Sequence, residues 1–453
     1  MATRGWKALA WAMAAACFAL AQAQAQMLLR DAEIEQWLRD YAEPLMDVAG
    51  VPAEGIDILL IGDPSVNAFA GPGIMGMHTG TITTADTPNE VEGVLAHEVG
   101  HLAGAHAVRG QEAMAKASRP AMLSLVLGAA LIAAGAPPEA GMAAAGLGQS
   151  VGIGNYLAYS QGQESAADQA GAGYLEAVGS SGEGLVTFFG KLQNRQLLTS
   201  RRIDPYMQTH PLATRRMAML RDRVAAMEHY GEEDSPEEIE RLRMIQAKIN
   251  GFMQGPQTTL RRYPLRDQSA PARYARAVAY YRASDLEKAQ REIDRLIEEE
   301  PDNPFFQELK GQMLFEHGRV AEAVAPHRQS VALGPQYALL KINLARALVA
   351  TEKPEAVQEA IGLLNVALEM EPDNAFGWTE LARAHARQGR TDLASLAQAE
   401  ADFARGDLPS AHRFATRARD DLEAGTPEHQ QALDILNASE DAARKARRHG
   451  RRG

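Results

Sequence analysis

The sequence predicts a mainly α-helical protein in two parts: an N-terminal domain that includes a small β-sheet, and a C-terminal array of helical repeats. Three observations support this fold class. The stretch from Ile56 to Ile82 alternates apolar and polar residues as β-strands do, with Gly and Pro between the runs. A histidine-rich apolar segment with helical spacing follows at residues 93–106. Beyond residue 270, similar segments recur at a nearly constant interval.

The composition is that of a globular protein with more than one domain. The chain has 453 residues, of which 46% are hydrophobic and 23% are charged, and one core seldom organises so long a chain. The formal net charge of −12 argues against a general surface for nucleic acid, so we expect no nucleic-acid partner. The basic run from Arg444 to Arg452 is expected to be a solvated terminus.

Residues 1–25 have the pattern of a cleaved secretory signal. Arg4 and Lys7 precede an apolar stretch from Ala8 to Ala21, and overlapping A-x-A sites follow it. The only cysteine, Cys17, lies in this stretch, so the mature chain would have no thiol and His and carboxylate side chains would have to hold any zinc. A lipoprotein signal centred on Cys17 is the weaker alternative, because Ala14 stands where such signals usually carry leucine.

The motif HEVGH at residues 97–101 can form one half of a metal site. Residues four apart share a helix face, so His97 and His101 can direct their imidazoles at one point while Glu98 lies beside them. Two neutral imidazoles suit Zn²⁺, and the adjacent carboxylate can take a proton from a metal-bound water. The alternative is a pair of core histidines satisfied by hydrogen bonds. Because the five-residue pattern rarely occurs by chance, we favour the metal site.

A hydrolytic zinc site needs a third protein ligand from elsewhere in the chain. His106 is the nearest candidate, but it follows His101 by five residues, whereas proteases with a third histidine in the motif space it by six. We therefore reject it. The segment YSQGQESAADQAG places Glu164 and Asp168 one turn apart on a second helix. One carboxylate can bind metal while the other orients a ligand histidine, although such a pair alone is usually a solvated helix face.

An apolar segment separates the two halves of this site. From Pro120 to Gln163 the only charged residue is Glu139, and two prolines at 137 and 138 interrupt the segment. The apolar run before this break has about 16 residues, too few to span a hydrocarbon core of about 30 Å comfortably. We expect a hairpin that is buried or lies on a membrane surface, and not a transmembrane helix.

The C-terminal part predicts tetratricopeptide-type helical repeats. Pro301, Pro335 and Pro372 follow one another at intervals of 34 and 37 residues. Small residues fall at matching places in successive helices, where paired helices must approach closely: Ala277, Gly311 and Ala345 in the first helices, and Ala289, Ala323 and Ala360 in the second. A coincidental run of alanine-rich helices is the alternative.

These features divide the chain into five segments. Residues 1–25 are the signal peptide. Residues 26–225 form a zincin-type metallopeptidase domain, which includes the apolar hairpin at 120–163. Residues 226–269 are a helical connector, 270–425 the tetratricopeptide repeats, and 426–453 a C-terminal helix with a basic tail.

The chain resembles the BepA-like periplasmic zinc metallopeptidases, relatives of HtpX and of the CAAX prenyl endopeptidases. The resemblance covers nearly the whole chain in order, through the signal peptide, NAFAGPG, HEVGH, ESAAD, THPLATRRMAML and the repeats. It implies that His97, His101 and Glu164 bind one Zn²⁺ per chain. It also implies that Glu98 is the general base and that Asp168 supports the metal ligands.

The resemblance further implies a role for His210, as a switchable extra zinc ligand that masks the active site. From the sequence alone, a single histidine in a loop is usually an exposed side chain. The sequence departs from the family pattern at His78, where an apolar residue would be expected.

Motif and resemblance together predict a zinc endopeptidase of the bacterial periplasm with a chaperone-like role in quality control and assembly of outer-membrane β-barrel proteins. The expected partners are unfolded or stalled outer-membrane proteins, the β-barrel assembly machinery through the repeats, and a membrane in peripheral contact. An extended substrate would pair with a sheet edge formed by Asn67, Ala68, Phe69 and Ala70. The alternative is a non-catalytic scaffold or chaperone with a structural zinc, although such a site needs no base at Glu98.

Overall fold

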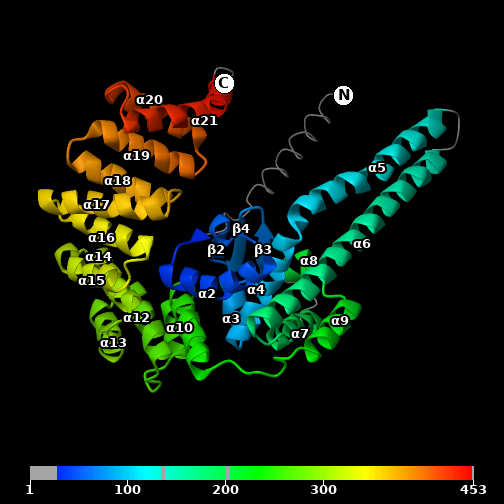
Figure 1. The fold of residues 1–453 in the computed structure, drawn as a ribbon, viewed down its shortest axis with the longest axis horizontal. Helices are drawn as coiled ribbons and strands as arrows, with labels where there is room; N and C mark the ends of the chain where they lie inside the picture. The colour runs from blue at the N-terminus through cyan, green and yellow to red at the C-terminus, as the bar shows by residue number, and fades with distance from the viewer. Residues whose placement is uncertain (1–27, 134–137, 199–204, 451–453) are drawn as a thin grey trace, which may run out of the picture. The chain divides into compact units, whose positions relative to one another are not determined.

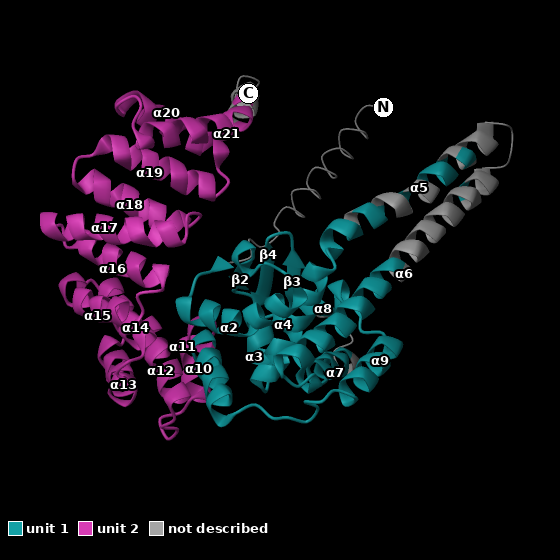
Figure 2. Cartoon of the chain, in the orientation of Figure 1, with its two compact units in different colours: residues 1–249 teal, residues 250–453 magenta. Residues whose placement is uncertain are grey.

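The computed structural model describes residues 28–133, 138–198 and 205–450 (Figure 1). The chain forms two compact units, residues 1–249 and 250–453 (Figure 2). The predicted signal peptide and the last three residues of the predicted basic tail lie outside the described residues.

The first unit contains the sheet and the helices around it. Its elements are β1 (Leu28–Leu29), α2 (Ala32–Ala49), η1 (Ala53–Gly55), β2 (Asp57–Ile61), β3 (Ala68–Gly71), β4 (Ile74–His78), α3 (Thr79–Thr84), α4 (Pro88–Ala103), α5 (His106–Ala133), α6 (Pro138–Val178), α7 (Glu183–Leu198), α8 (Pro205–Thr209), α9 (Thr214–Ala225) and α10 (Pro236–Met253), which runs across the boundary between the units.

The sheet has the strand order β1-β2-β4-β3. β2 and β4 are parallel, whereas β3 is antiparallel to β4 and pairs Phe69 with Gly76. Pro72 and Gly73 connect β3 to β4, and the positive φ of Gly73, 75°, is the backbone conformation that favours glycine in such a turn. β3 is therefore an edge strand.

The helix that carries the HEVGH motif, α4, is buried along most of its length. Thr87 caps its N-terminus by accepting a hydrogen bond from the amide of Glu90. Residues 88–100 are all buried, and α4 packs against α2, α6, α7 and β3. Gly100 permits the close contact with α6, because a Cβ there would lie 2.8 Å from the carbonyl oxygen of Ala167. The small residue thus brings α6 within reach of the two histidines.

α5 and α6 form a long hairpin that extends beyond the rest of the first unit (Figure 1). The predicted pair Glu164 and Asp168 lies on the same helix as the second arm of the hairpin. Toward its tip, the described apolar side chains are exposed by 60% or more: Met122, Leu123, Leu125, Leu127 and Met142. The alternative of a buried hairpin is therefore wrong for these side chains. Among the helices that the structure describes, none is long and apolar enough to cross a membrane.

The second unit is a stack of helix pairs (Figure 2). Its helices are α11 (Pro256–Arg262), α12 (Ala270–Arg282), α13 (Leu286–Glu299), α14 (Pro304–Glu316), α15 (Val320–Leu333), α16 (Ala338–Ala350), α17 (Pro354–Met370), α18 (Ala375–Arg387), α19 (Thr391–Ala404), α20 (Leu408–Asp421) and α21 (Pro427–Gly450).

The predicted repeats are confirmed, with α12 and α13, α14 and α15, α16 and α17, and α18 and α19 as successive pairs. The matched small residues are buried between helices. At Gly311 a Cβ would lie 2.7 Å from the ring of His327 on the paired helix. Asn303 and Asn374 each follow a repeat proline, Pro301 or Pro372, by two residues, and each caps the helix that follows.

Candidate active site

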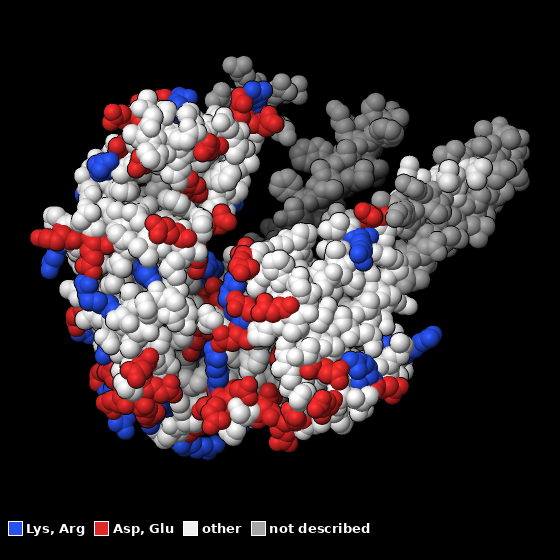
Figure 3. Space-filling model, viewed as in Figure 1, with Lys and Arg blue, Asp and Glu red and all other residues white. Residues whose placement is uncertain are grey.

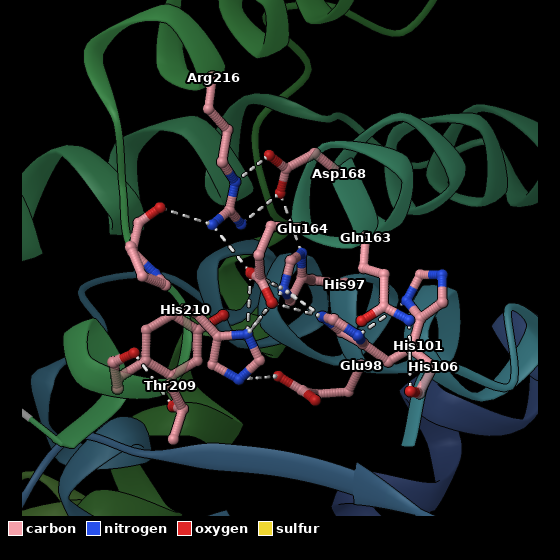
Figure 4. Close-up of polar contacts among 12 residues, drawn as sticks. His97, Glu98, His101, His106, Gln163, Glu164, Asp168, Thr209, His210 and Arg216 are labelled. Atoms are coloured by element: carbon pink, nitrogen blue, oxygen red, sulfur yellow. Dashed lines mark hydrogen bonds and ion pairs between the residues drawn. The ribbon is translucent and has the colours of Figure 1, made fainter. Parts of the chain in front are cut away.

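Four side chains from three segments converge beside the sheet (Figure 4). His97 and His101 come from α4, Glu164 from α6, and His210 directly follows α8. One ligand atom from each of these residues, called the quartet below, lies within 4.8 Å of all the others. The structure therefore brings the HEVGH and ESAAD motifs together at one point, as their residue types predicted.

Five pairs of quartet residues lie about as far apart as the ligands of a tetrahedral metal ion. His97 Nε2 lies 3.1 Å from His101 Nε2 and 3.3 Å from His210 Nδ1. Oxygens of Glu164 lie 3.5 Å from His97 Nε2, 3.4 Å from His101 Nε2 and 3.0 Å from His210 Nδ1. Four ligand atoms each about 2.0–2.1 Å from a zinc ion would be about 3.3 Å apart. Nitrogen and carboxylate donors also suit this ion, so the residues present fit a bound metal.

Glu98 lies next to the quartet, and its carboxylate accepts no hydrogen bond from the described residues. The residue is fully buried. Burial raises the pKa of Glu98. Its side chain faces His210, whose Nε2 lies 3.7 Å from Glu98 Oε1. A buried carboxylate without a hydrogen bond is costly and points to a chemical role.

Asp168 lies behind the quartet and is itself held by Arg216 of α9. One oxygen of Asp168 lies 3.0 Å from His97 Nδ1, the ring nitrogen that faces away from the quartet. Arg216 binds Asp168 through Nε and Nη2, and its Nη1 lies 2.9 Å from Glu164 Oε2 (Figure 4). Burial raises the pKa of Asp168, but the hydrogen bonds from Arg216 and His97 outweigh it and lower the pKa. Asp168 is thus an ionised acceptor that orients His97.

The two motif histidines differ in their affinity for protons. Burial, and then the neighbouring His97, lower the pKa of His101 to about 2. Burial lowers the pKa of His97 as well, but Asp168 and Glu164 outweigh it and raise the pKa to about 9. Without a metal the site therefore holds a proton on His97. A divalent cation would compete with that proton, as cations do at His and carboxylate sites.

His210 is buried and anchored on both sides. Only 7% of its surface is exposed, so the expectation of an exposed loop histidine is wrong. The ring of Tyr206 stacks on the His210 ring with their centroids 4.5 Å apart. The amide of Tyr206 donates to the carbonyl of Val66, just before β3, at 3.3 Å. On the other side, Arg216 donates to the carbonyl of Pro211 at 3.2 Å.

The comparisons with known proteins agree with this geometry. Residues 32–224 match peptidase family M48, and this range contains the whole quartet together with Glu98 and Asp168. The chain is a metalloprotease. The beta-barrel assembly-enhancing protease of Yersinia pestis is 27% identical to it over 429 residues, which are 92% of this chain and 86% of that protein. The protein of the same name from Escherichia coli (strain K12) is 27% identical over 416 residues, 88% of this chain and 81% of that protein. Metalloprotease LoiP of Escherichia coli (strain K12) is 33% identical over 167 residues, 36% of this chain and 60% of that protein.

His106 of the metalloprotease contacts the site without joining the quartet. Its Nδ1 lies 2.9 Å from His101 Nδ1, on the side of that ring that faces away from the quartet. The chain reverses at Ala105, whose φ is 48°, and the His106 ring folds over Gly104, where a Cβ would lie 2.3 Å from it. His106 therefore lies outside the quartet, as its spacing from His101 predicts. No pattern in the sequence indicates that His106 would instead face the back of His101.

The predicted substrate edge is only partly free. The amide of Asn67 donates to Thr81 Oγ1, and its carbonyl accepts from the amide of His78. Because successive strand residues direct their polar groups to opposite sides, Ala68 and Ala70 direct theirs away from β4. The pocket beside the quartet is lined by Phe69 and Ala70 of β3, so this strand forms one wall of the site.

His78 lies outside the quartet, at the end of β4. It is buried, with Nδ1 3.1 Å from Ser65 Oγ and 4.0 Å from Asp63 Oδ1. Burial lowers the pKa of His78. Its contacts hold the loop between β2 and β3, which is a structural role in place of the apolar residue expected there.

Proposed function

We propose that this metalloprotease is a zinc-dependent endopeptidase in which His97, His101 and Glu164 hold one Zn²⁺. The observation that carries the proposal is the quartet itself, whose donor atoms lie close enough to share one ion, with the carboxylate of Glu98, which accepts no hydrogen bond from the described residues, beside them. A purely structural zinc would need no such carboxylate. This feature favours catalysis over the alternative of a non-catalytic scaffold.

The side chains around the ion would divide the work. Bound zinc would polarise the scissile carbonyl and make water a stronger nucleophile. Glu98 takes the proton of the attacking water and returns it to the leaving amine. Its raised pKa suits a carboxylate that must first accept a proton and then donate it. Asp168, held by Arg216, fixes the orientation of His97.

His210 would be the switchable fourth ligand. Its Nδ1 lies 3.0 Å from Glu164 and 3.3 Å from His97, and these distances support a fourth ligand. A hydrolytic zinc site keeps one position open for water or substrate. With His210 bound the enzyme would be masked, and α8 would have to move before turnover.

The substrate would be an extended, unfolded chain. β3 is an edge strand, and Ala68 and Ala70 direct main-chain groups away from the sheet. Pairing with such an edge supplies hydrogen bonds without demanding a fixed sequence, which suits a protease that removes misfolded proteins.

By its likeness to the beta-barrel assembly-enhancing proteases, the enzyme would act in the periplasm on unfolded or stalled outer-membrane β-barrel proteins. The repeats of the second unit would bind these clients or their assembly machinery, as stacked helical repeats commonly bind proteins. The predicted signal at residues 1–25 supports export across the inner membrane.

Metal analysis of the purified mature protein, with casein cleavage before and after chelation, tests the catalytic proposal. We expect one zinc per chain, loss of cleavage on chelation, and recovery when zinc is restored. Cleavage that survives complete removal of the metal would overturn it.

A pull-down with purified β-barrel assembly machinery tests the role of the repeats. The full chain should retain the machinery, and a chain ending at residue 249 should not. Zinc content of the shortened protein serves as the control for folding. Equal retention by both proteins would contradict the assignment to the second unit.

A further inference from the structure

The outer part of α5 exposes apolar side chains over more than half of the circumference of this helix. Met122, Leu123, Leu125 and Leu127 are 65%, 65%, 60% and 61% exposed. At 3.6 residues per turn these four positions cover an arc of about 200° on α5. Ser124, which is 9% exposed, lies outside that arc. The exposed apolar surface is therefore wider than the apolar stripe, about 100° or somewhat more, with which a helix usually packs on a protein core.

On the second arm, the described side chain of Met142 of α6 is 67% exposed. The sequence from residue 120 to 163 contains one charged residue, Glu139. A helix that is apolar all round is normally buried in a protein core or in a membrane. Soluble proteins rarely expose an apolar patch of this kind without a function for it.

We propose that the hairpin tip inserts into the surface of a phospholipid bilayer and anchors the metalloprotease there. A protein partner usually covers one face of a helix and is ringed by polar residues. Lipid instead surrounds an element on every exposed side, which is what this distribution requires. Anchoring of this kind needs no catalysis and so does not depend on the proposed function.

The charges next to the apolar segment fit the headgroup region. Arg109, Lys116 and Arg119 precede the apolar part of α5, against a single acidic residue, Glu112. Basic residues at such a boundary are attracted to anionic lipid headgroups, and long basic side chains can reach the interface from a helix. The net positive charge of this boundary contrasts with the net charge of −12 for the whole chain, whose Asp and Glu side chains are spread over much of the described surface in Figure 3.

The apolar part of α5 is long enough to enter a bilayer but too short to cross it. From Pro120 to Ala133, α5 rises by about 21 Å, more than half of a hydrocarbon core of about 30 Å but less than its full thickness. Gly110 and Met114, farther back on the same helix, line the pocket beside the quartet. From Gly110 to Pro120 the helix rises about 15 Å. An anchored enzyme would thus hold its active site close above the membrane surface.

Flotation of the full-length protein with vesicles tests the proposal. The probes are vesicles of phosphatidylcholine alone and of phosphatidylethanolamine with phosphatidylglycerol. The wild-type protein should float with both and more strongly with the anionic vesicles. The double variant Leu123→Glu/Leu127→Glu should bind at least about 10-fold more weakly, because each charge must leave water to enter the lipid.

The control is Met219→Glu/Val366→Glu, which places two charges at exposed apolar residues outside the hairpin, 44% and 45% exposed. This protein should float like wild type. Failure of the wild-type protein to float with either vesicle, or normal flotation of Leu123→Glu/Leu127→Glu, would overturn the proposal. Zinc content and casein cleavage without vesicles, measured for every variant, separate loss of anchoring from loss of the active site.

Depth can be measured by fluorescence with brominated lipid. The tryptophan introduced by Leu125→Trp should be quenched, whereas one introduced by Val366→Trp should not. Strong binding of the hairpin to an unfolded outer-membrane protein, without quenching by lipid, would show that it is a client-binding arm and would overturn the lipid assignment.

Lys116→Gln/Arg119→Gln tests the contact with the headgroups. This variant should bind less to the anionic vesicles and normally to the phosphatidylcholine vesicles; equal loss with both vesicles would overturn the headgroup contact.

Discussion

Arg216 and Asp168 form a buried ion pair through two nitrogens of the guanidinium group. The pair joins α9 to α6 directly behind His97, and the same guanidinium also contacts Glu164 and the carbonyl of Pro211. One side chain therefore connects both carboxylates of the ESAAD motif with the segment that carries His210. The orientation of the quartet depends on it.

Arg216→Leu should destabilise the first unit strongly, because it leaves the buried carboxylate of Asp168 without its partner. Breaking such a pair typically costs about 3–5 kcal/mol. The matched control is Arg223→Leu on the same helix, whose partly exposed pair with Glu176 should contribute less than about 1 kcal/mol. Urea unfolding of both variants measures the difference. Equal, small effects would show that the buried pair does not support the fold.

Glu98→Gln should keep its metal and lose proteolysis. The amide has nearly the shape of the carboxylate but cannot take a proton, and general base catalysis typically contributes about 10²- to 10⁴-fold. Glu92→Gln is the matched control, since Glu92 is also buried on α4 but binds Ser180 and Asn89. Casein cleavage and zinc content report the two properties. Casein cleavage at the wild-type rate by Glu98→Gln would show that Glu98 is not the general base.

Glu164→Ala should lose metal affinity. The only cysteine of the chain, Cys17, lies in the predicted signal peptide, and the neighbouring Asp168 is occupied by Arg216. Asp168→Asn should weaken binding only by the 10- to 100-fold typical of residues that orient a ligand. Glu176→Ala, on the same helix but at the surface, is the control. Competition with a chelator ranks the metal affinities of the three variants. Full retention of the metal by Glu164→Ala would show that the third protein ligand lies elsewhere.

His210→Ala should raise activity. The substitution empties the fourth corner of the quartet, and if the masked form exceeds the open form tenfold, turnover should rise by about that factor. His229→Ala, at a histidine outside the site that pairs with Glu232, should change nothing. A drop of about 10²-fold on casein, with zinc retained, would instead assign His210 to stabilising the oxyanion of the transition state.

The stability of the first unit should fall as the pH rises toward neutrality, because of Glu92. Burial, reinforced by Asp234 and Glu238, raises the pKa of this carboxyl to about 7 from an ordinary value of 4.5. The folded state therefore binds more protons than the unfolded state between these values. The loss amounts to up to about 3 kcal/mol at about 1.4 kcal/mol per pH unit. Urea unfolding at pH 5 and pH 8 should show this fall relative to Glu92→Gln; parallel profiles for the two proteins would contradict it.

Local periodicity in the sequence was sufficient for the parts of the site that share a helix. The four-residue spacing placed His97 and His101 together, and the same spacing placed Glu164 and Asp168 together. Matched small residues such as Ala277 and Gly311 likewise predicted the repeats, because helices can approach closely only where side chains are small.

The rest depends on contacts between distant segments, which no local pattern encodes. Arg216 meets Asp168 across 48 positions, and nothing in its own neighbourhood distinguishes it from Arg215. The close approach at Gly100, which brings α6 to α4, is equally invisible in the sequence. The exposure of the hairpin is known only from the structure, because an uncharged apolar helix has the same sequence pattern in a protein core and at a membrane.

The hydrogen bond from the amide of Tyr206 to the carbonyl of Val66 ties the segment that carries His210 to the loop that leads into β3. The segment that carries His210 is attached to the residue that enters β3, so a chain that binds along this strand acts on the backbone to which the mask is fixed. If His210 masks the site, the free energy of opening is subtracted from the affinity of every substrate. Short or weakly bound peptides would mostly leave the mask in place. Long extended chains would open it and be cut, so that discrimination between folded and unfolded proteins would rest on contact length and not on a recognised sequence.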